Sequence, residues 1–263
     1  MKHSDGKSIS GKFKDGRYEG AYIPESAGVS IEISYVFSQG TYKGAVNSNN
    51  MPNGKGTLVY NNGQTYAGDF VDGLYSGSGT LTNAKGQKYV GTFVKGVMLG
   101  KGIATWPNGN RYEGEFAANQ PDGKGTFSWQ GGSYRGHFAD GEFEGEGEII
   151  RNGIVARGNF RAHELTGQAT WFLPNGDKVT AKAKNGAPHG PGKYIWKNGD
   201  VLETTFKDGK GTIVREDGSH VGPTPHTGGG MIDVQSARPE KSKIRNEGWA
   251  RPSGVVGGGI RFY

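Results

Sequence analysis

The stretch Tyr66-Ala-Gly68-Asp-Phe70 decides the fold, because its pattern recurs three more times along the chain. The copies are Tyr89-Val-Gly91-Thr-Phe93, Tyr112-Glu-Gly114-Glu-Phe116 and Tyr134-Arg-Gly136-His-Phe138. They follow one another at intervals of 22 or 23 residues, and a fixed period of this length is typical of a repeat array. Each copy continues into an Asp-Gly or Lys-Gly pair and then towards a Gly-x-Gly. This succession predicts two short strands and two turns in every unit.

Alignment of the units gives three columns that share one face of a strand, because alternate residues of a strand point the same way. The first column is mostly tyrosine, the second mostly glycine and the third mostly phenylalanine. We interpret the glycine column as room for neighbouring rings to stack across strands. The columns read Tyr42, Tyr66, Tyr89, Tyr112, Tyr134, Ala156, Val179, Leu202, then Gly44, Gly68, Gly91, Gly114, Gly136, Gly158, Ala181, Thr204, then Val46, Phe70, Phe93, Phe116, Phe138, Phe160, Ala183, Phe206.

The second strand of each unit adds an apolar column and, on its opposite face, a row of threonines suited to water. The apolar column contains Leu58, Leu81, Ala104, Phe127, Ile149, Trp171, Tyr194 and Ile213, and the threonines are Thr57, Thr80, Thr126, Thr170 and Thr212.

The first unit allows two alignments, which begin at Ile9 or at Tyr18. We prefer Ile9, because a turn then falls at Asp15-Gly16 and an insertion explains the longer gap to Tyr42. Residues 29–37 alternate between apolar and polar types and predict a strand. We therefore predict a lead at residues 1–8, an array of nine units at 9–221 and a Gly-rich extended tail at 222–263. The units begin near residues 9, 42, 66, 89, 112, 134, 156, 179 and 202.

The pattern resembles the MORN repeat, whose units read Tyr-Glu-Gly-Glu-aromatic, then Asn/Asp-Gly, then Gly-x-Gly. The stretch Tyr112-Glu-Gly114-Glu-Phe116, followed by Asp122-Gly123-Lys-Gly125, is close to that consensus. The last three units depart from it, through Ala156, Val179 with Ala181 and Ala183, and Leu202 with Thr204. We expect a shallower or differently filled groove there.

The fold expected from the resemblance is all-β, an elongated, single-layer, twisted antiparallel sheet of stacked hairpins. At about 4.8 Å per strand, nine units would extend on the order of 80–90 Å. The composition agrees, because 49 glycines and 33% hydrophobic residues suit an array in which each hairpin completes the next.

Composition also limits the compartment and the chemistry. The chain has no cysteine, which excludes disulfides and zinc–cysteine sites. No apolar run opens the chain as a signal peptide would, and no run of about 18 apolar residues could span a membrane. We expect a cytoplasmic protein, with signal-independent export or a peripheral place at a membrane left open.

The tail carries six basic and three acidic residues. The formal net charge of the whole chain is +6. One interpretation is a solvated, disordered end. We favour a docking segment on the chain's own array or on another chain, because the tail contains apolar residues that include Trp249, Phe262 and Tyr263.

Motifs for catalysis, cofactors and metals fail on inspection. Residues 6–12 have P-loop spacing, but Phe13 occupies the place of the magnesium-binding Ser or Thr. The Gly-x-Gly pairs lack the third glycine of the dinucleotide fingerprint, so we interpret them as turn glycines. His137, His163 and His189 share no column and have no metal-ligand spacing. We predict no catalytic residue, no cofactor and no metal, hence no enzyme.

Four glutamates alternate from Glu142 through Glu144 and Glu146 to Glu148. At this spacing they would share a face. They form either a solvated acidic rim or a contact for a basic segment, for which the chain's own tail is the nearest candidate.

Three functions are compatible with the sequence: a protein-interaction scaffold, a binder of anionic membranes, or an accessory array of an enzyme complex. The residues between the aromatic columns mix both charge signs and neutral types, as Lys43, Glu113 and Arg135 illustrate, which favours the scaffold over the membrane binder. We expect the partner to be another protein or a second copy of the chain, with weak binding to anionic lipid and no nucleic acid. The predicted contact residues are Tyr66, Phe70, Tyr89, Phe93, Tyr112, Phe116, Trp106, Trp129, Trp249, Phe262 and Tyr263.

Overall fold

The computed structural model describes residues 13–14, 17–18, 31–37 and 39–211, and within these ranges it contains strands and no helix. The chain divides into two compact units with a boundary between Gln120 and Pro121. The predictions for Ile9 and for the tail from Gly222 onward concern residues outside these ranges.

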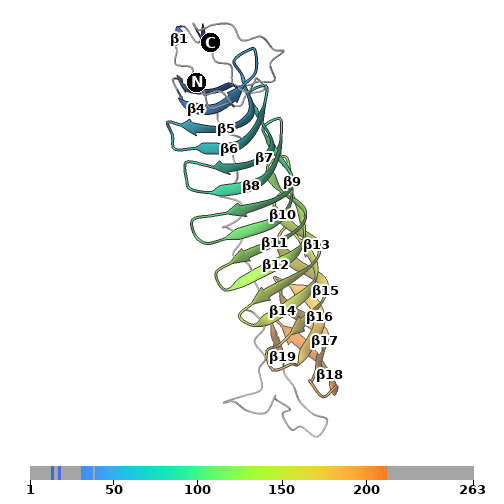
Figure 1. Ribbon diagram of the computed structural model, residues 1–263. Helices are drawn as coiled ribbons and strands as arrows, with labels where there is room; N and C mark the ends of the chain where they lie inside the picture. The colour runs from blue at the N-terminus through green and yellow to red at the C-terminus, as the bar shows by residue number, and fades with distance from the viewer. Residues whose placement is uncertain (1–12, 15–16, 19–30, 38, 212–263) are drawn as a thin grey trace. The chain divides into compact units, whose positions relative to one another are not determined.

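In the first unit, strands β3 to β10 pair in chain order into an antiparallel sheet, and alternate turns, such as those joining β5 to β6 and β7 to β8, lie along the same side (Figure 1). The two short strands β1 (Phe13–Lys14) and β2 (Arg17–Tyr18) pair with each other. The strands of the sheet are β3 (Ile31–Phe37), β4 (Gly40–Val46), β5 (Pro52–Tyr60), β6 (Thr65–Val71), β7 (Leu74–Thr82), β8 (Lys88–Val94), β9 (Val97–Thr105) and β10 (Arg111–Ala117).

In the second unit, strands β11 to β19 continue the same sequential antiparallel pairing. The strands are β11 (Gln120–Trp129), β12 (Gly132–Ala139), β13 (Glu142–Arg151), β14 (Ile154–Arg161), β15 (Glu164–Phe172), β16 (Lys178–Lys184), β17 (Ala187–Ile195), β18 (Val201–Lys207) and β19 (Lys210–Gly211). The prediction of an all-β sheet of stacked hairpins is confirmed.

The Asp-Gly and Lys-Gly pairs that follow Phe70, Phe93 and Phe138 form tight turns, as predicted, whereas after Phe116 the turn is Ala118-Asn119 and Asp122-Gly123 lies in β11. Asp72 and Gly73 have φ angles of 47° and 80°, and Lys95 and Gly96 have 48° and 81°. Two successive positive φ angles define the type I′ turn, whose twist matches that of the flanking strands. Each pair therefore closes one hairpin in a fixed register.

The Gly-x-Gly pairs do not form turns, so this part of our interpretation is wrong. In β7, Gly79 pairs with Gly68 and Ser76 pairs with Asp69, which leaves Gly77 and Ser78 as extra residues in a bulge. Gly77 has a φ of 59°, a conformation that glycine adopts without steric cost. A bulge of this kind bends the strand, and it recurs at Gly100, Gly145, Gly167 and Gly190, all with positive φ.

The bend folds each hairpin over its own aromatic residues. Tyr66 lies before the bulge and Tyr75 after it, about 13 Å apart along a flat strand pair. Their rings nevertheless stack, with centroids 3.8 Å apart and planes 10° apart. The aromatic face is therefore the concave, interior side of the bent sheet.

The glycine column lies beneath the tyrosine rings. A Cβ atom on Gly79 would stand 2.4 Å from Tyr66 Oη and 2.6 Å from its ring, and Tyr66 Oη donates a hydrogen bond to the Asp69 carbonyl at 2.9 Å. The glycines thus make room for the tyrosine of their own repeat. Rings of neighbouring repeats meet edge to face, as Tyr66 and Phe93 do with centroids 5.1 Å apart.

The later repeats fill their interior with a different residue. Trp171 lies opposite both Ala156 and Val179 in the sheet register and is fully buried. Its indole occupies the space that tyrosines fill in the earlier repeats. The expectation of a differently filled interior is confirmed at these positions.

Candidate interaction surface

The six predicted contact residues on the aromatic columns are core residues. Their exposed fractions are 2% or less, so a partner at the surface cannot reach them. The bend of the strands buries these rings, because a flat strand pair would leave the same rings on an open face. The residues are Tyr66, Phe70, Tyr89, Phe93, Tyr112 and Phe116.

Two of the three tryptophans predicted as contact residues lie in the part of the chain that the structure describes. Trp106 and Trp129 are half-buried at the ends of β9 and β11, and Trp129 packs against Phe127 with ring centroids 5.8 Å apart. Trp249, Phe262 and Tyr263 lie outside the described residues, so their role stays a prediction.

The convex side of the sheet is the surface that a partner can contact. Side chains diverge there at the bend, and the backbone of column glycines such as Gly68 and Gly136 is half-exposed between them. We call the row of half-exposed column glycines the glycine floor. On one side of the glycine floor, each strand contributes one outward side chain, which lies directly opposite the outward side chain of the next strand. We call these cross-strand side chains the outer row.

The outer row of the first unit is largely neutral. It contains the exposed Val90, at 42%, between Thr80 and Ile103. Its charged members are Lys43 and Glu113. The members, in strand order, are Ser34, Lys43, Thr57, Ala67, Thr80, Val90, Ile103 and Glu113.

The outer row of the second unit carries charges of both signs among threonines. Arg157 forms an ion pair with Glu148 and lies over the Phe172 ring, 4.8 Å from its centroid. At about 4.8 Å per strand the row is on the order of 30 Å long. The members are Thr126, Arg135, Glu148, Arg157, Thr170, Thr180, Lys193 and Glu203.

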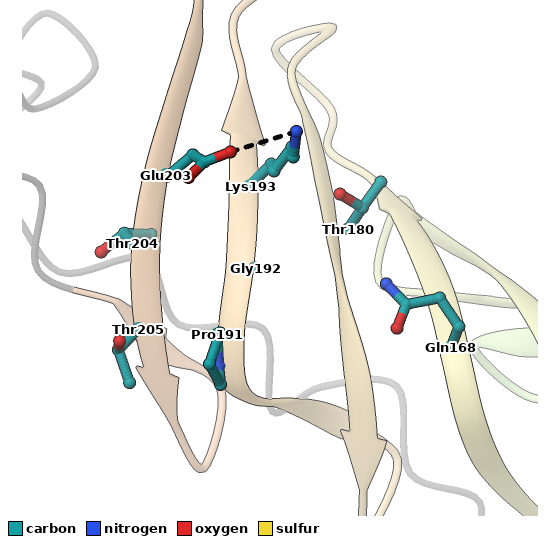
Figure 2. Close-up of a pocket in the computed structure, with 8 residues that line it drawn as sticks. All are labelled: Gln168, Thr180, Pro191, Gly192, Lys193, Glu203, Thr204 and Thr205. Carbon is teal, nitrogen blue, oxygen red and sulfur yellow. Dashed lines mark ion pairs between the residues drawn. The ribbon is translucent and has the colours of Figure 1, made fainter.

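A hollow of about 460 Å³ lies at the C-terminal end of this row. Figure 2 shows its lining side chains on neighbouring strands, with Lys193 and Glu203 joined by an ion pair of 3.2 Å. Thr204 lies opposite Gly192 in the glycine column, and Thr205 and Pro191 complete the wall on the other side of that column. Both charges of this hollow are already paired with each other.

A second hollow, of about 600 Å³, lies at the beginning of the row. Arg135, Lys124 and His137 line it together with Glu146, and all four side chains are exposed. Among the described residues Arg135 forms no ion pair within 4.0 Å. Its guanidinium therefore keeps its five donors available to a ligand or a partner.

The four alternating glutamates do not act as one acidic surface. The strand bends at Gly145, whose φ is 65°, between Glu144 and Glu148. Glu148 pairs with Arg157, and Glu144 accepts a hydrogen bond from the Ala162 amide at 3.3 Å. Glu146 is the exposed member of the four. This arrangement does not support a single contact, formed by all four glutamates together, that would bind a basic segment.

The described residues include no group of three or more His, Asp or Glu side chains that could hold a metal ion. They also include no helix that could span a membrane. Burial raises the pKa of several core tyrosines, Tyr66, Tyr75 and Tyr134 among them. Because these phenols are buried and neutral, they stabilise the core and offer no acid or base to a substrate.

Several buried polar residues in turns escaped the sequence analysis. Asp177, 5% exposed, accepts hydrogen bonds from Tyr194 Oη and from the Lys197 amide, and Gln64, Gln87 and Asn110 are also buried. Each of these residues directly follows the glycine of a turn, and in most of these turns an asparagine precedes that glycine. This turn sequence is the feature from which the residues could have been predicted. A turn sequence alone does not distinguish an inward-pointing side chain from a solvated one.

The model of the MORN repeat matches residues 48–65, 66–88, 89–111, 112–133, 134–153 and 184–201. The chain belongs to the MORN-repeat family. The unmatched residues 154–183 include Ala156, Val179 and Ala181, where the column pattern changes. MORN repeats are commonly interaction or membrane-binding modules.

The sequence matches no curated protein. Among solved structures, the MORN chain is similar to the SAS-4 TCP domain of Drosophila melanogaster in complex with a proline-rich motif of Ana2. The identity is 14%, the TM-score 0.40, and the match covers 73% of this chain and 100% of that chain. For the TCP10 domain of Danio rerio CPAP in complex with a STIL peptide, the values are 14%, 0.19, 67% and 100%.

Proposed function

We propose that the chain is a non-enzymatic scaffold that binds another protein through the outer row of its second unit, with Arg135 at the centre of the contact. The observation that supports this is the state of Arg135. Arg135 is exposed, lies on a strand of the hydrogen-bonded sheet and lines a hollow. It forms no ion pair with another described residue. Arginine is enriched at protein interfaces because its planar guanidinium recognises carboxylates and aromatic faces.

An anionic membrane suits this surface less well than a protein does. Arg135, Arg157 and Lys193 share their row with Glu148 and Glu203, so a bilayer of one charge sign would meet attraction and repulsion together. We expect binding to vesicles with anionic headgroups to be weak and to disappear at moderate salt. Tight, salt-resistant vesicle binding would instead favour the membrane function.

Affinity capture with three chains tests the proposal. Wild type, Arg135→Glu and Lys43→Glu are immobilised at equal density, and proteins retained from an extract of the source cells are quantified by mass spectrometry. Lys43 is the matched control, because it is exposed at the equivalent position of the first unit's outer row. Both substitutions reverse one positive charge on the same kind of strand position.

We expect the wild type and Lys43→Glu to retain the same specific proteins, and Arg135→Glu to lose them. Circular dichroism of the three chains establishes that all are folded. Equal retention by all three chains, or loss with Lys43→Glu alone, would contradict a contact centred on Arg135.

A further inference from the structure

His163 fastens one repeat of the second unit to the repeat before it. It is the second residue of the turn between β14 and β15, with a φ of 68°, and it is 4% exposed. Its amide donates to the Phe143 carbonyl at 3.2 Å. In return, the Phe143 amide donates to His163 Nδ1 at 3.2 Å. Two hydrogen bonds thus join the turn to β13, and the imidazole packs edge to face on the Phe143 ring, 4.7 Å away.

Asn119 makes the same pair of bonds in the first unit. Its amide donates to the Met98 carbonyl, and the Met98 amide donates to Asn119 Oδ1 at 2.9 Å. Most other turns have glycine at this position and make only the first bond. At Pro52, Pro121 and Pro188 the partner residue has no amide hydrogen that would need an acceptor. At Tyr75 the partner residue has an amide hydrogen, and Gly96 still makes only the first bond. The histidine therefore supplies to the Phe143 amide an acceptor that a glycine at this position could not supply.

We propose that His163 is a proton-sensitive clamp, which closes the junction between β13 and the β14–β15 turn when neutral and releases it when protonated. An imidazole that accepts at Nδ1 carries its single proton on Nε2. A second proton can bind only at Nδ1, where it faces the Phe143 amide hydrogen. Two donors then oppose each other inside the core, and a buried cation loses its hydration.

The carboxylates around the turn act in the opposite direction, because they stabilise an imidazolium, whereas the cation Arg161 adds to the effect of burial. Glu142 and Glu144 on β13 and Glu164 on β15 bring carboxylates near the turn, and Arg161 precedes it. The three glutamates are half-buried and Arg161 is exposed, so water screens their effect on an imidazolium. The lost hydrogen bond and the burial act directly on the imidazole, so we expect release to prevail as the pH falls.

Amide hydrogen exchange of Phe143 measures the clamp. Wild type is compared with His163→Asn, which copies the chain's own arrangement at Asn119, and with His163→Gly, which has the commoner turn residue. Between about pH 7.5 and pH 5.0, corrected for intrinsic exchange, we expect wild-type protection to fall up to about thirty-fold relative to His163→Asn. The other histidines and the carboxylates are identical in all three chains and cancel in the comparison.

Two further results are expected. His163→Asn protects Phe143 at both pH values, and His163→Gly protects it less at both, without the additional acid loss. Parallel acid responses in wild type and both variants would overturn the clamp. A gain of wild-type protection at acid pH would overturn it too, because the neighbouring carboxylates would then stabilise a closed imidazolium.

Discussion

Four column tyrosines, Tyr42, Tyr66, Tyr89 and Tyr134, each cover two glycines that face each other beneath the ring. Tyr134 shows the arrangement: Cβ atoms on Gly136 and Gly147 would stand 2.3 Å and 2.5 Å from its hydroxyl oxygen. The hydroxyl itself donates to the His137 carbonyl at 3.0 Å. Ring and backbone are therefore in contact with no spare volume, and this contact recurs from Tyr42 onward.

Gly136→Ala tests this contact. We expect a loss of about 1–3 kcal/mol in the free energy of unfolding, because the added methyl group overpacks a buried ring. Gly158→Ala is the matched control, since Ala156 replaces the tyrosine there and the new Cβ atom would meet Leu165 Cδ1 at 2.9 Å and Ala169 Cβ at 3.0 Å. Urea unfolding of both variants should give the larger loss for Gly136→Ala. Equal losses would show that the tyrosine ring does not determine the glycine requirement.

The buried phenols also make the array sensitive to alkali. Burial raises the pKa of Tyr89 to about 12, and it raises the pKa of Tyr66 and Tyr134 as well. An unfolded tyrosine ionises near pH 10. The stabilisation is therefore complete below about pH 10 and falls as the pH rises towards the folded pKa, by up to roughly 1.4 kcal/mol per pH unit for each tyrosine.

Urea unfolding at a series of pH values, with phenolate absorbance recorded in the folded state, checks this dependence. We expect the midpoint to fall steeply above about pH 10 while the core tyrosines stay protonated until the chain unfolds. Ionisation of all tyrosines near pH 10 in a chain that stays folded would show that the phenols are exposed to water.

At the scale of the element, the hairpins were predictable and their bend was not. Alternating residues and Asp-Gly pairs such as Asp72-Gly73 specify strands and type I′ turns through local backbone preferences. Gly77-Ser78-Gly79 fits a turn or a bulge equally well, and the choice depends on which residues of β6 it faces. That register arises only once the sheet forms. For the same reason, the burial of Tyr66 and the inward position of His163 could not be inferred from columns alone.

Gly167→Ala tests the bulge without altering packing. Gly167 has a φ of 66°, and no atom lies within 4 Å of the position that its Cβ would occupy. The cost should therefore come from the backbone alone, about 1 kcal/mol. Gly167→Asn should cost less, because asparagine tolerates this conformation better than alanine does. If thermal unfolding shows that Gly167→Ala is as stable as the wild type or more stable, a positive φ at this position is contradicted.

For the molecule as a whole, the structure reverses the assignment of inner and outer surfaces. The sequence columns suggested an aromatic groove for partners, whereas the bends place those rings in the core and leave the glycine floor and the outer rows outside. The two units then differ in what they present. Neutral residues such as Val90 mark the outer row of the first unit, and Arg135, Arg157 and Lys193 mark that of the second.

Hydroxyl-radical footprinting of the full chain, free and bound to a captured partner, tests this account most directly. We predict that Tyr66, Tyr89 and Tyr134 react little in the free chain because their rings are buried. Partner binding should then lower the reactivity of side chains around Arg135 and leave the first unit's outer row unchanged. Tyrosines that react readily in the free chain and become protected in the complex would contradict it, because the aromatic columns would then be the binding surface.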